Sequence, residues 1–373
     1  MGEHTDYNEG FVLPFALAQG VTATAAARDD GLLVLRSKQV PDEPVTVEIG
    51  SLAPGSVGGW AAYPAGVAWA LRAAGFGVGG AAIDFDSDLP VGAGVSSSAA
   101  LECAVALALC SLSGISVPRP ELAAIAKRAE NEFVGAPTGI IDQSAALLCQ
   151  EGHAMLLDCG TLEIAQVPLR PAVAGVSILV IDTRVAHALV SGEYAARRAE
   201  CEAAAAALGV PSLGARARDG ADAAIVDRLA DPVLRRRARH VIADSERAMA
   251  IAVALAEAGA GSAAGAAGTA GTAGASEIWR YLGTLLIEGH ASLRDDFEVS
   301  WPQADLTVDA AIAAGSYGAK MIGGGFGGSV LALVPAGRAG AVRAALTETY
   351  LSRGWIPPEF LDAVPSPPAR RLR

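Results

Sequence analysis

The stretch that decides the fold reads LPVGAGVSSSAALECAVALAL and runs from Leu89 to Leu109. Gly92 and Gly94 allow backbone amides to approach a ligand closely, and three serines then lead into an apolar helix that we expect to begin near Ala99. These serines are Ser96, Ser97 and Ser98. A helix start presents free amides and the positive end of the helix dipole, which bind phosphate without a lysine. The alternative, a glycine turn with a serine cap on a buried helix, fits these residues equally well.

A second glycine cluster reads MIGGGFGGSVLALV and runs from Met321 to Val334. Five glycines surround Phe326, and a run typical of a strand follows them. Because so many glycines cost conformational entropy on folding, we infer a need for close backbone approach, with a tight turn as the alternative. The chain has no GxxxxGK[ST], HRD or DFG motif, which excludes the phosphate sites of P-loop proteins and protein kinases.

The acidic composition limits the possible partners. The 373 residues carry a formal net charge of -12, which argues against binding nucleic acid through the overall field. Mean hydropathy is +0.37, yet no run of about 18 strongly apolar residues indicates a membrane span. The stretch MGEHTDYNEG is polar and acidic, unlike a signal peptide. We therefore expect a cytoplasmic protein that binds neither nucleic acid nor membrane.

The cysteines predict no metal site and no disulfide framework. Their number is odd, they form no CxxC pair, and most lie within apolar runs, so we expect small buried hydrophobic side chains. They are Cys103, Cys110, Cys149, Cys159 and Cys201.

Short β-branched runs alternate with long helical patterns along the chain. GVSILVIDT, residues 175–183, precedes the helical pattern SGEYAARRAECEAAAAALG, residues 191–209, and predicts a mixed α and β protein. The pattern changes near Pro168 to Val176, and the length favours two domains, which we place at residues 1–170 and 171–373. The segment from Gly259 to Ala275 contains only alanine, glycine, threonine and serine, and we expect a mobile loop between two helices there.

Three blocks give the chain a family resemblance. GEHTDYNEGFVLP (Gly2 to Pro14), PVGAGVSSSAA (Pro90 to Ala100) and GGGFGGSVLAL (Gly323 to Leu333) occur in the order of the GHMP kinase superfamily, and the first resembles the galactokinase signature. The resemblance implies an α+β fold of two GHMP kinase domains, with helices packed on mixed sheets and the active site in the cleft between the domains. It implies ATP and galactose as substrates with Mg²⁺ on the phosphates, and we expect a monomer.

The resemblance implies a Mg²⁺ site made by Ser98 and Glu130. Ser98 offers a hydroxyl beside the phosphates, and Glu130 offers a carboxylate oxygen, the ligand type that Mg²⁺ prefers. Glu130 also borders a predicted buried helix stripe, so the residues alone favour a salt bridge over a metal. The stripe consists of Leu122, Ile125, Ala126, Ala129 and Phe133. Family members use the glutamate of this motif for Mg²⁺.

Asp142 lies between GII and the helical pattern QSAALLCQ. From the residues alone, a helix N-cap is the favoured interpretation, because aspartate often serves there. In galactokinases, however, the aspartate of this GIxDQ block is the catalytic base for the sugar hydroxyl. The resemblance therefore makes Asp142 the base, and a carboxylate of ordinary pKa suffices for a loose transition state.

The segment GEHTDYN offers several side chains that accept or donate hydrogen bonds to sugar hydroxyls. Without the resemblance it would be a solvated stretch, and Tyr194 would be an ordinary aromatic on a helix surface. The resemblance makes Glu3, His4 and Asp6 galactose ligands, joined from the other matched blocks by Gly139 and Tyr194.

Trp60 and Tyr63 lie at helical spacing in GGWAAYPAGVAWAL, and Val67 and Leu71 continue the stripe. Such a stripe is more often part of a core. Because the corresponding family segment lines the nucleotide pocket, the resemblance implies that Trp60 and Tyr63 contact adenine.

Two other functions stay open, both with the same fold. One is a kinase for another sugar such as N-acetylgalactosamine, which would need room at the 2-position. The other is a catalytically silent sensor of galactose and ATP, although the presence of both Asp142 and Glu130 favours an enzyme. Galactokinases carry a strand of the type GRVNLI before GEHTDY, with an arginine beside the reacting groups, and Met1 stands at its last apolar position. We therefore expect in-frame codons upstream to encode such a strand, and the longer protein to be the active one.

Overall fold

The computed structural model describes residues 1–89, 94–186, 192–218, 223–263 and 270–372. The chain forms two compact units. Unit 1 contains Met1–Phe15, Gly92–Val95 and Gln150–Ser366. Unit 2 contains Ala16–Val91, Ser96–Cys149 and Pro367–Arg373. Both units combine helices with sheets, so the predicted α+β class is confirmed.

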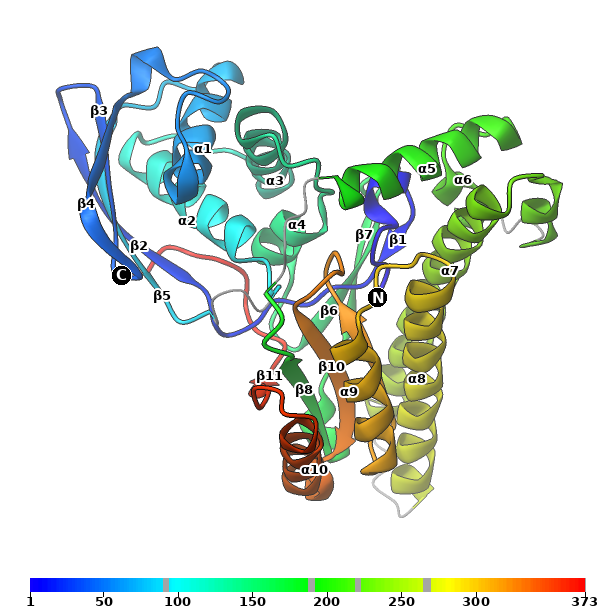
Figure 1. Ribbon diagram of the computed structural model, residues 1–373. Helices are drawn as coiled ribbons and strands as arrows, with labels where there is room; N and C mark the ends of the chain where they lie inside the picture. The colour runs from blue at the N-terminus through cyan, green and yellow to red at the C-terminus, as the bar shows by residue number, and fades with distance from the viewer. Residues whose placement is uncertain (90–93, 187–191, 219–222, 264–269, 373) are drawn as a thin grey trace. The chain divides into compact units, whose positions relative to one another are not determined.

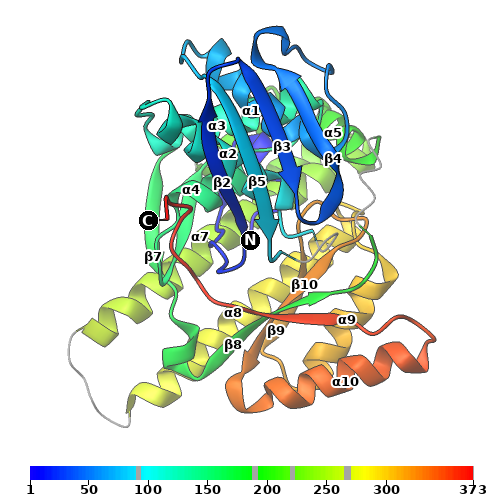
Figure 2. The same ribbon diagram turned by 90° about the vertical axis from the view of Figure 1, so that its left-hand side faces the viewer.

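Unit 2 is built on a four-stranded sheet in the order β2-β5-β3-β4, with its helices on one face (Figure 2). The strands β3 and β5 are parallel, and the other neighbours are antiparallel. The strands are β2 (Val21–Arg28), β3 (Leu32–Ser37), β4 (Val40–Glu48) and β5 (Gly80–Ser87). The helices are α1 (Ala62–Ala73), α2 (Ser97–Leu112), α3 (Arg119–Arg128) and α4 (Ile141–Leu148), with short turns η2 (Ile49–Ser51) and η3 (Gly59–Ala61).

Alternation along the strands explains why the helices cover only one face of this sheet. In β5, Ile83 and Phe85 are buried, whereas Asp84 and Asp86 between and beyond them are exposed. Side chains at every second position of a strand point to the same face, so the apolar set requires a helical cover. Val67 and Leu71 of α1 provide part of it, since both are fully buried.

The helix that carries Glu130 ends in an unusual turn. Helix α3 passes directly into η4 (Ala129–Val134), a single π-helical turn. The predicted stripe is confirmed, because all of its residues belong to the buried core. A π-turn inserts one residue into the helical repeat, and such turns are frequent at functional sites. Glu130 is thereby placed at a position that an uninterrupted helix would not provide.

Unit 1 holds two antiparallel sheets, in the orders β11-β8-β10-β9 and β1-β6-β7 (Figure 1). The strands are β1 (Phe11–Val12), β6 (His153–Asp158), β7 (Ile164–Pro168), β8 (Val176–Asp182), β9 (Gly318–Ile322), β10 (Ser329–Pro335) and β11 (Glu359–Ala363). The helices are α5 (Glu193–Leu208), α6 (Leu213–Arg218), α7 (Pro232–Ala263), α8 (Ala270–Asp295), α9 (Pro302–Ala313) and α10 (Ala339–Ser352). Short turns are η1 (Asp6–Asn8), η5 (Pro171–Ala174), η6 (Ala223–Arg228) and η7 (Ala336–Arg338).

The two units divide the chain differently from the predicted change at residue 170. That residue lies inside unit 1, because β7 pairs with β6 and β6 pairs with β1 near the start of the chain. Unit 2 instead ends its main segment at Cys149 and regains residues from Pro367 onward. The pairing of β1 with a strand about 145 positions later has no local sequence signal.

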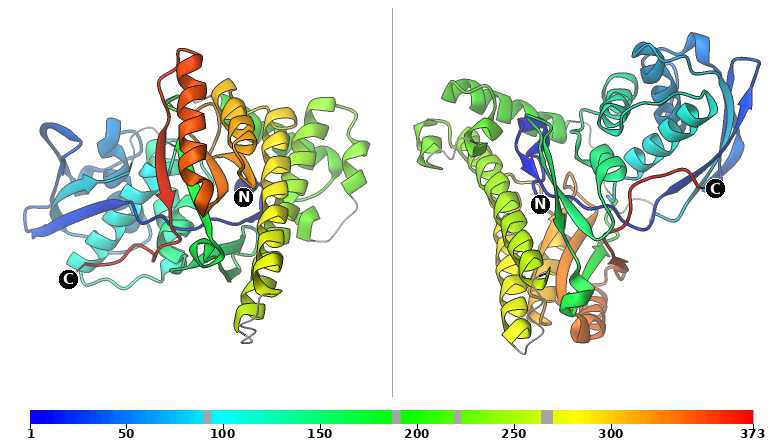
Figure 3. Two further views of the ribbon diagram at one scale, coloured as in Figure 1. Left: turned by 90° about the horizontal axis from the view of Figure 1, so that it is seen from below. Right: turned by 180° about the vertical axis from the view of Figure 1, so that it is seen from behind.

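The predicted mobile loop at 259–275 is wrong at both ends. Gly259 to Ala263 belong to α7, and Ala270 to Ala275 belong to α8, while residues 264–269 lie outside the described residues. The long helices α7 and α8 run side by side (Figure 3). Their mutual packing and the helix propensity of alanine outweigh the cost of the glycines and threonines. Within the described residues, no helix combines the length and the apolar character needed to cross a bilayer.

Helix α8 crosses strand β9 at a contact between glycines. A Cβ atom on Gly283 would lie 2.2 Å from the carbonyl oxygen of Tyr317, and one on Gly318 would lie 2.1 Å from that of Gly283. We expect Gly283→Ala to lower the unfolding temperature measurably, with a cost of about 1–3 kcal/mol from overpacking. Gly340→Ala in α10 is the control, because a Cβ there meets nothing within 4 Å, and it should be neutral or stabilising. Equal melting curves for the two variants would contradict this close contact.

Candidate functional site

The segment that begins the chain is folded into a compact coil by its own hydrogen bonds. The hydroxyl of Thr5 donates to the carbonyl oxygens of Gly2 and Phe11, both at 2.8 Å, and Thr5 is fully buried. The amide of Asn8 donates to the carbonyl oxygen of His4 at 2.8 Å. His4 adopts a left-handed φ of 64° within this coil. The polar side chains of the signature are therefore held on a fixed backbone instead of a solvated terminus.

His4 is buried and has partners on both ring nitrogens. Its Nε2 lies 3.1 Å from the carbonyl oxygen of Gly324, and its Nδ1 lies 2.9 Å from the Tyr7 hydroxyl. Burial, and then the nearby His240, lower the pKa of His4 to about 3, so the ring is neutral. Since a carbonyl only accepts, Nε2 donates to Gly324 and Nδ1 accepts from Tyr7. A sugar hydroxyl would have to replace one of these partners.

Tyr194 lies beside the signature segment in unit 1. It lies in the first turn of α5, with its ring centroid 5.1 Å from that of His4 and 5.5 Å from that of Tyr7. Phe297, which follows α8, packs against His4 with the ring centroids 4.7 Å apart. Asp6 is buried nearby in sequence, and its Oδ1 accepts from the Tyr7 amide at 2.9 Å. The structure thus brings Glu3, His4, Asp6 and Tyr194 into one unit.

Glu3 forms a buried ionic cluster that the sequence does not reveal. The ammonium of Lys320 in β9 contacts Glu3 and lies 4.0 Å from Asp244 of α7. Asp244 also accepts from the Gly2 amide at 2.9 Å and from Arg247 at 3.0 Å. Burial raises the pKa of Glu3, but the charge and hydrogen bond of Lys320 and the charge of the nearby amino group together outweigh it, so the pKa lies below its ordinary value. Glu3 is therefore a carboxylate whose position is fixed from outside the signature.

The third glycine motif makes the close backbone contacts that its composition predicts. A Cβ on Gly325 would lie 2.4 Å from the carbonyl oxygen of Val299, and one on Gly323 would lie 3.2 Å from the carbonyl oxygen of Gly94. Phe326 has a left-handed φ of 59°, and its amide donates to Val299 at 2.8 Å. Gly94 of the predicted phosphate loop thus lies against the third motif within unit 1. Gly92 lies outside the described residues.

The helix of the predicted phosphate loop begins earlier than expected and without a serine cap. Helix α2 begins at Ser97, two positions before Ala99. Ser96 occupies the N-cap position with a left-handed φ of 60°, and its side chain makes no capping hydrogen bond. The serine-cap alternative is therefore wrong for Ser96. The first amides of α2 are not satisfied by this side chain, and Ser97 is exposed while Ser98 is half-buried.

Glu130 is a buried carboxylate held by neutral donors. It is 4% exposed, and its Oε2 accepts from the Thr138 hydroxyl at 2.6 Å and from the Gln143 amide at 2.8 Å. The ion pairs among the described residues do not include Glu130, so the salt-bridge interpretation is wrong there. Both hydrogen bonds from the described residues end on Oε2, which leaves Oε1 without a donor among them.

A second buried acid near Glu130 has no motif in the sequence analysis. Glu102 of α2 is fully buried, and its Oε2 accepts from the Gln143 amide at 3.0 Å. Burial, and then the charge of Glu130, raise the pKa of Glu102 to about 9. Its position within the apolar run of α2 is the only signal that could have identified it, since an acid inside such a run needs a partner.

Asp142 is half-buried in the first turn of α4. The N-cap interpretation is wrong, because Ile140 occupies the cap position. The charges of Asp142 and Glu130 both act on Glu102 and Cys103, whose pKa values they raise after burial. The carboxyl groups are therefore near one another in unit 2, and Gly139 lies two positions before Ile141, the first residue of the helix that carries Asp142.

Trp60 and Tyr63 continue into one helix but have different surroundings. Trp60 lies in η3 and packs edge-on against Phe85 of the sheet, with centroids 5.9 Å apart. Tyr63 lies in α1, and burial followed by the charges of Glu130 and Glu102 raises the pKa of its hydroxyl. Tyr63 thus borders the carboxylates, whereas Trp60 borders the core.

The residues present fit a magnesium ion that shares its coordination with phosphates. Among the described residues, no group of three or more His, Cys, Asp or Glu side chains could hold a metal. Mg²⁺ usually keeps several waters and binds through one or two carboxylates plus substrate phosphates. A buried carboxylate with one oxygen without a protein donor satisfies this pattern, and Ser98 lies in the same unit.

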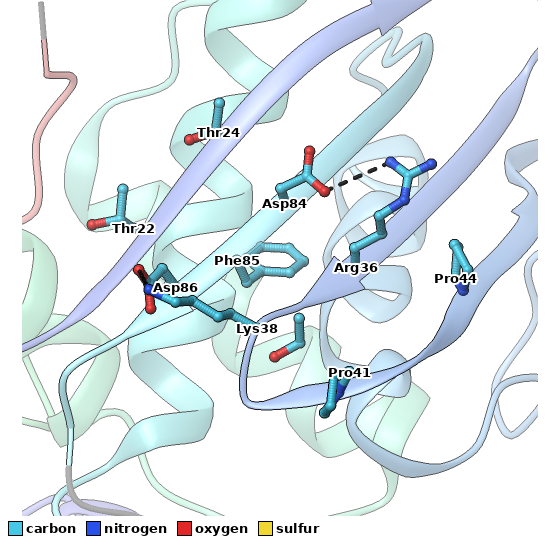
Figure 4. Close-up of a pocket in the computed structure, with 10 residues that line it drawn as sticks. Thr22, Thr24, Arg36, Lys38, Pro41, Pro44, Asp84, Phe85 and Asp86 are labelled. Atoms are coloured by element: carbon cyan, nitrogen blue, oxygen red, sulfur yellow. Dashed lines mark hydrogen bonds and ion pairs between the residues drawn. The ribbon is translucent and has the colours of Figure 1, made fainter.

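A hollow of about 550 Å³ lies on the sheet of unit 2 (Figure 4). Its rim carries the ion pairs Arg36–Asp84 at 3.6 Å and Lys38–Asp86 at 2.8 Å. These side chains are exposed and neutralise one another, and the residues that line the hollow include none of the predicted site residues. We therefore do not include it in the candidate site.

The chain is similar to known proteins over its whole length. Three family models match: the galactokinase galactose-binding signature at residues 1–27, the GHMP kinases N terminal domain at 62–150 and the GHMP kinases C terminal at 277–351. The chain is 46% identical to a galactokinase of Streptomyces coelicolor, over 100% of this chain and 91% of that protein. It is 40% identical to a galactokinase of Mycobacterium tuberculosis, over 100% of this chain and 96% of that protein.

Solved structures give the same result. The structure of Lactococcus lactis galactokinase complexed with galactose matches with a TM-score of 0.88 and 30% identity, over 100% of this chain and 92% of that one. A Methanococcus jannaschii mevalonate kinase matches with a TM-score of 0.62 and 14% identity, over 97% and 94%, which indicates a shared fold. With the two-domain GHMP kinase architecture confirmed and relatives similar along its full length, the chain belongs to the galactokinase family of the GHMP kinases.

Proposed function

We propose that this protein transfers the terminal phosphoryl group of ATP to the anomeric hydroxyl of galactose, giving galactose 1-phosphate and ADP. The observation that carries the proposal is the galactose-binding signature at residues 1–27, folded into a rigid coil against Tyr194. Relatives named galactokinase that match over the full chain support it. That the protein acts as a monomer in the cytoplasm stays a prediction.

In this proposal Asp142 is the catalytic base. It accepts the proton of the anomeric hydroxyl as the oxygen attacks the terminal phosphorus, and the bond to ADP breaks without a covalent enzyme intermediate. In a loose transition state little proton transfer is needed before the attack, so positioning matters more than basicity. Asp142 is suited to this role because it is half-buried in the first turn of α4, a rigid element.

Phosphate binding falls to the start of α2 and the glycine next to it. Gly94, Ser96, Ser97 and Ser98 offer backbone amides and hydroxyls, and the dipole of α2 favours negative charge there. Ser98 and Glu130 would hold Mg²⁺, which neutralises charge on the phosphates when bound. This arrangement suits a chain of net charge -12, which has no lysine in its phosphate loop.

The proposed ligands of galactose are Glu3, His4, Asp6, Gly139 and Tyr194. Carboxylates of fixed orientation select among sugars, because a buried acceptor without its hydroxyl loses a hydrogen bond that water cannot replace. Trp60 and Tyr63 are the proposed adenine contacts. Tyr63 borders the carboxyl groups, whereas Trp60 does not. Replacing Tyr63 with Phe should therefore also affect Mg²⁺ binding.

A panel of sugars in a coupled assay of ADP formation tests the proposal. Galactose should be turned over well ahead of glucose and N-acetylgalactosamine, since the signature resembles that of the galactose enzymes. Equal rates on all three sugars would refute the preference. A faster reaction with N-acetylgalactosamine would favour the other-sugar kinase, and binding of galactose and ATP without turnover would favour the sensor.

A further inference from the structure

One amide connects three separate elements of unit 2. Gln143 of α4 donates to Glu102 of α2 at 3.0 Å and to Glu130 of the π-turn η4 at 2.8 Å. All three side chains are buried, and Gln143 and Glu102 are fully buried. We call this arrangement the Glu102–Gln143–Glu130 bridge. In it, the two N–H groups of one amide donate to two carboxyl groups.

The bridge fixes the orientation of Gln143. If the amide were reversed, its oxygen would face Oε2 of the Glu130 carboxylate, and the hydrogen bond to Glu130 would be lost. Because Glu102 takes one N–H group, the other is directed at Oε2 of Glu130. Thr138 donates to the same oxygen at 2.6 Å. Glu130 is thus pinned through one oxygen, and its Oε1 receives no hydrogen bond from the described residues.

Burying Glu102 costs folding free energy. Its Oε1 has no hydrogen-bond partner among the described residues, and no cation pairs with it there. An acid placed in the apolar face of α2 without a counter-charge lowers stability, so packing alone does not account for it. Its one hydrogen bond leads to the residue that holds Glu130 and that follows Asp142 in α4.

We propose that Glu102 is a positioning residue for the metal site: it orients the Gln143 amide, which in turn holds Glu130 with one carboxylate oxygen directed toward Mg²⁺. Glu102 touches neither the metal nor the substrates. The inference rests on the proposed function, in which Glu130 is a metal ligand. Outer partners of metal ligands typically change metal affinity by about 10–100-fold when they are removed.

The test measures metal binding directly, with Mn²⁺ as the probe. Electron paramagnetic resonance of free Mn²⁺ gives its affinity for the full chain with ADP present, without any turnover. We expect Glu102→Leu to weaken Mn²⁺ binding by about tenfold or more, because the acceptor is lost. Glu102→Gln keeps an acceptor oxygen and the shape, so it should remain close to wild type. Glu130→Gln is the positive control and should lose at least as much affinity as Glu102→Leu.

A matched control separates the bridge from general destabilisation. Val105→Ala lies on the same helix, is fully buried and removes packing without touching the bridge, so its Mn²⁺ affinity should be unchanged. If Glu102→Leu does not fold, Gln143→Met tests the same step from the other side, with the same expected loss. The double variant, Glu102→Leu with Gln143→Met, should bind Mn²⁺ no more weakly than the weaker-binding single variant. Both substitutions interrupt the same hydrogen-bonded bridge, so their effects should not add.

Several results would overturn the inference. One is a wild-type Mn²⁺ affinity in Glu102→Leu, and another is a loss of Mn²⁺ affinity in Val105→Ala as large as that in Glu102→Leu. The others are additive losses of affinity in the double variant, and a Glu102→Gln variant that binds Mn²⁺ as weakly as Glu102→Leu. Galactose affinity without metal should be the same in all these variants. A protein that phosphorylates galactose yet shows no Mn²⁺ effect would refute only the bridge, whereas a protein that phosphorylates no galactose would refute the proposed function.

Discussion

Replacing Asp142 with asparagine is expected to reduce kcat by about 100-fold or more, while galactose and ATP binding change only severalfold. Asparagine nearly preserves the shape of the side chain in the first turn of α4 but cannot accept the proton of the sugar hydroxyl. Initial rates at saturating substrates measure kcat, and calorimetric titration measures binding.

Glu121→Gln is the matched control for this variant. Glu121 is also an acid in the first turn of a helix of unit 2, but it is exposed. Its loss should leave kcat unchanged, which excludes a general effect of removing helix charge. If Asp142→Asn retains more than about a tenth of the wild-type kcat, Asp142 is not the base.

Replacing Lys320 with methionine is expected to destabilise unit 1 by about 3–5 kcal/mol, because it leaves the buried Glu3 without the side-chain cation that it contacts. Lys320 is 1% exposed, contacts Glu3 and lies 4.0 Å from the fully buried Asp244. The pKa of Glu3 should rise once Lys320 no longer offsets its burial. Galactose binding should weaken in the same variant, since Glu3 is a proposed sugar ligand.

Urea denaturation at several pH values measures this effect. Glu3 and Asp244 both have a lowered pKa in the folded protein, so the stability they contribute through Lys320 is present at neutral pH and is lost as the pH falls and they take up protons. The difference between Lys320→Met and wild type should therefore shrink in acid. Lys38→Met is the control, because its pair with Asp86 is exposed and screened by solvent, so its loss should change stability little. Equal stability of the two variants would contradict the buried cluster.

The sequence predicted the elements whose signals are local. The part of the stripe that precedes Glu130 is buried as predicted, because the helical period is uninterrupted up to Arg128, the last residue of α3. The glycines of the third motif were predicted to allow close approach, and Gly325 meets Val299 at a distance that admits no side chain. In these places one short segment holds the whole physical reason.

Contacts between distant segments could not be predicted in the same way. Lys320 and Glu3 are 317 positions apart, and no motif at either position indicates the other as its partner. Glu102 lies within the apolar run of α2, but nothing in the sequence indicates that its partner is Gln143, 41 positions later. The compact units likewise divide the chain elsewhere than at residue 170, because the two-residue strand β1 pairs with β6 in unit 1. All three features depend on contacts between segments that are distant in the sequence.

Local propensity also misled in two places. Ser96 has the composition of an N-cap, yet its left-handed backbone directs the side chain away from a cap bond, as Gly94 before it also turns left-handed. The alanine-rich ends of the segment 259–275 continue α7 and α8 because helices already packed together extend at little cost.

The central claim is that the terminal phosphoryl group of ATP reaches the anomeric oxygen of galactose. Phosphorus NMR of a mixture of the protein, Mg²⁺, ATP and galactose tests it most directly, because it follows the transferred group itself. The account predicts that the γ-phosphate signal of ATP disappears while a phosphomonoester signal coupled to the anomeric proton grows in equal amount. A growth of inorganic phosphate alone, or a phosphomonoester coupled to any other sugar proton, would contradict it.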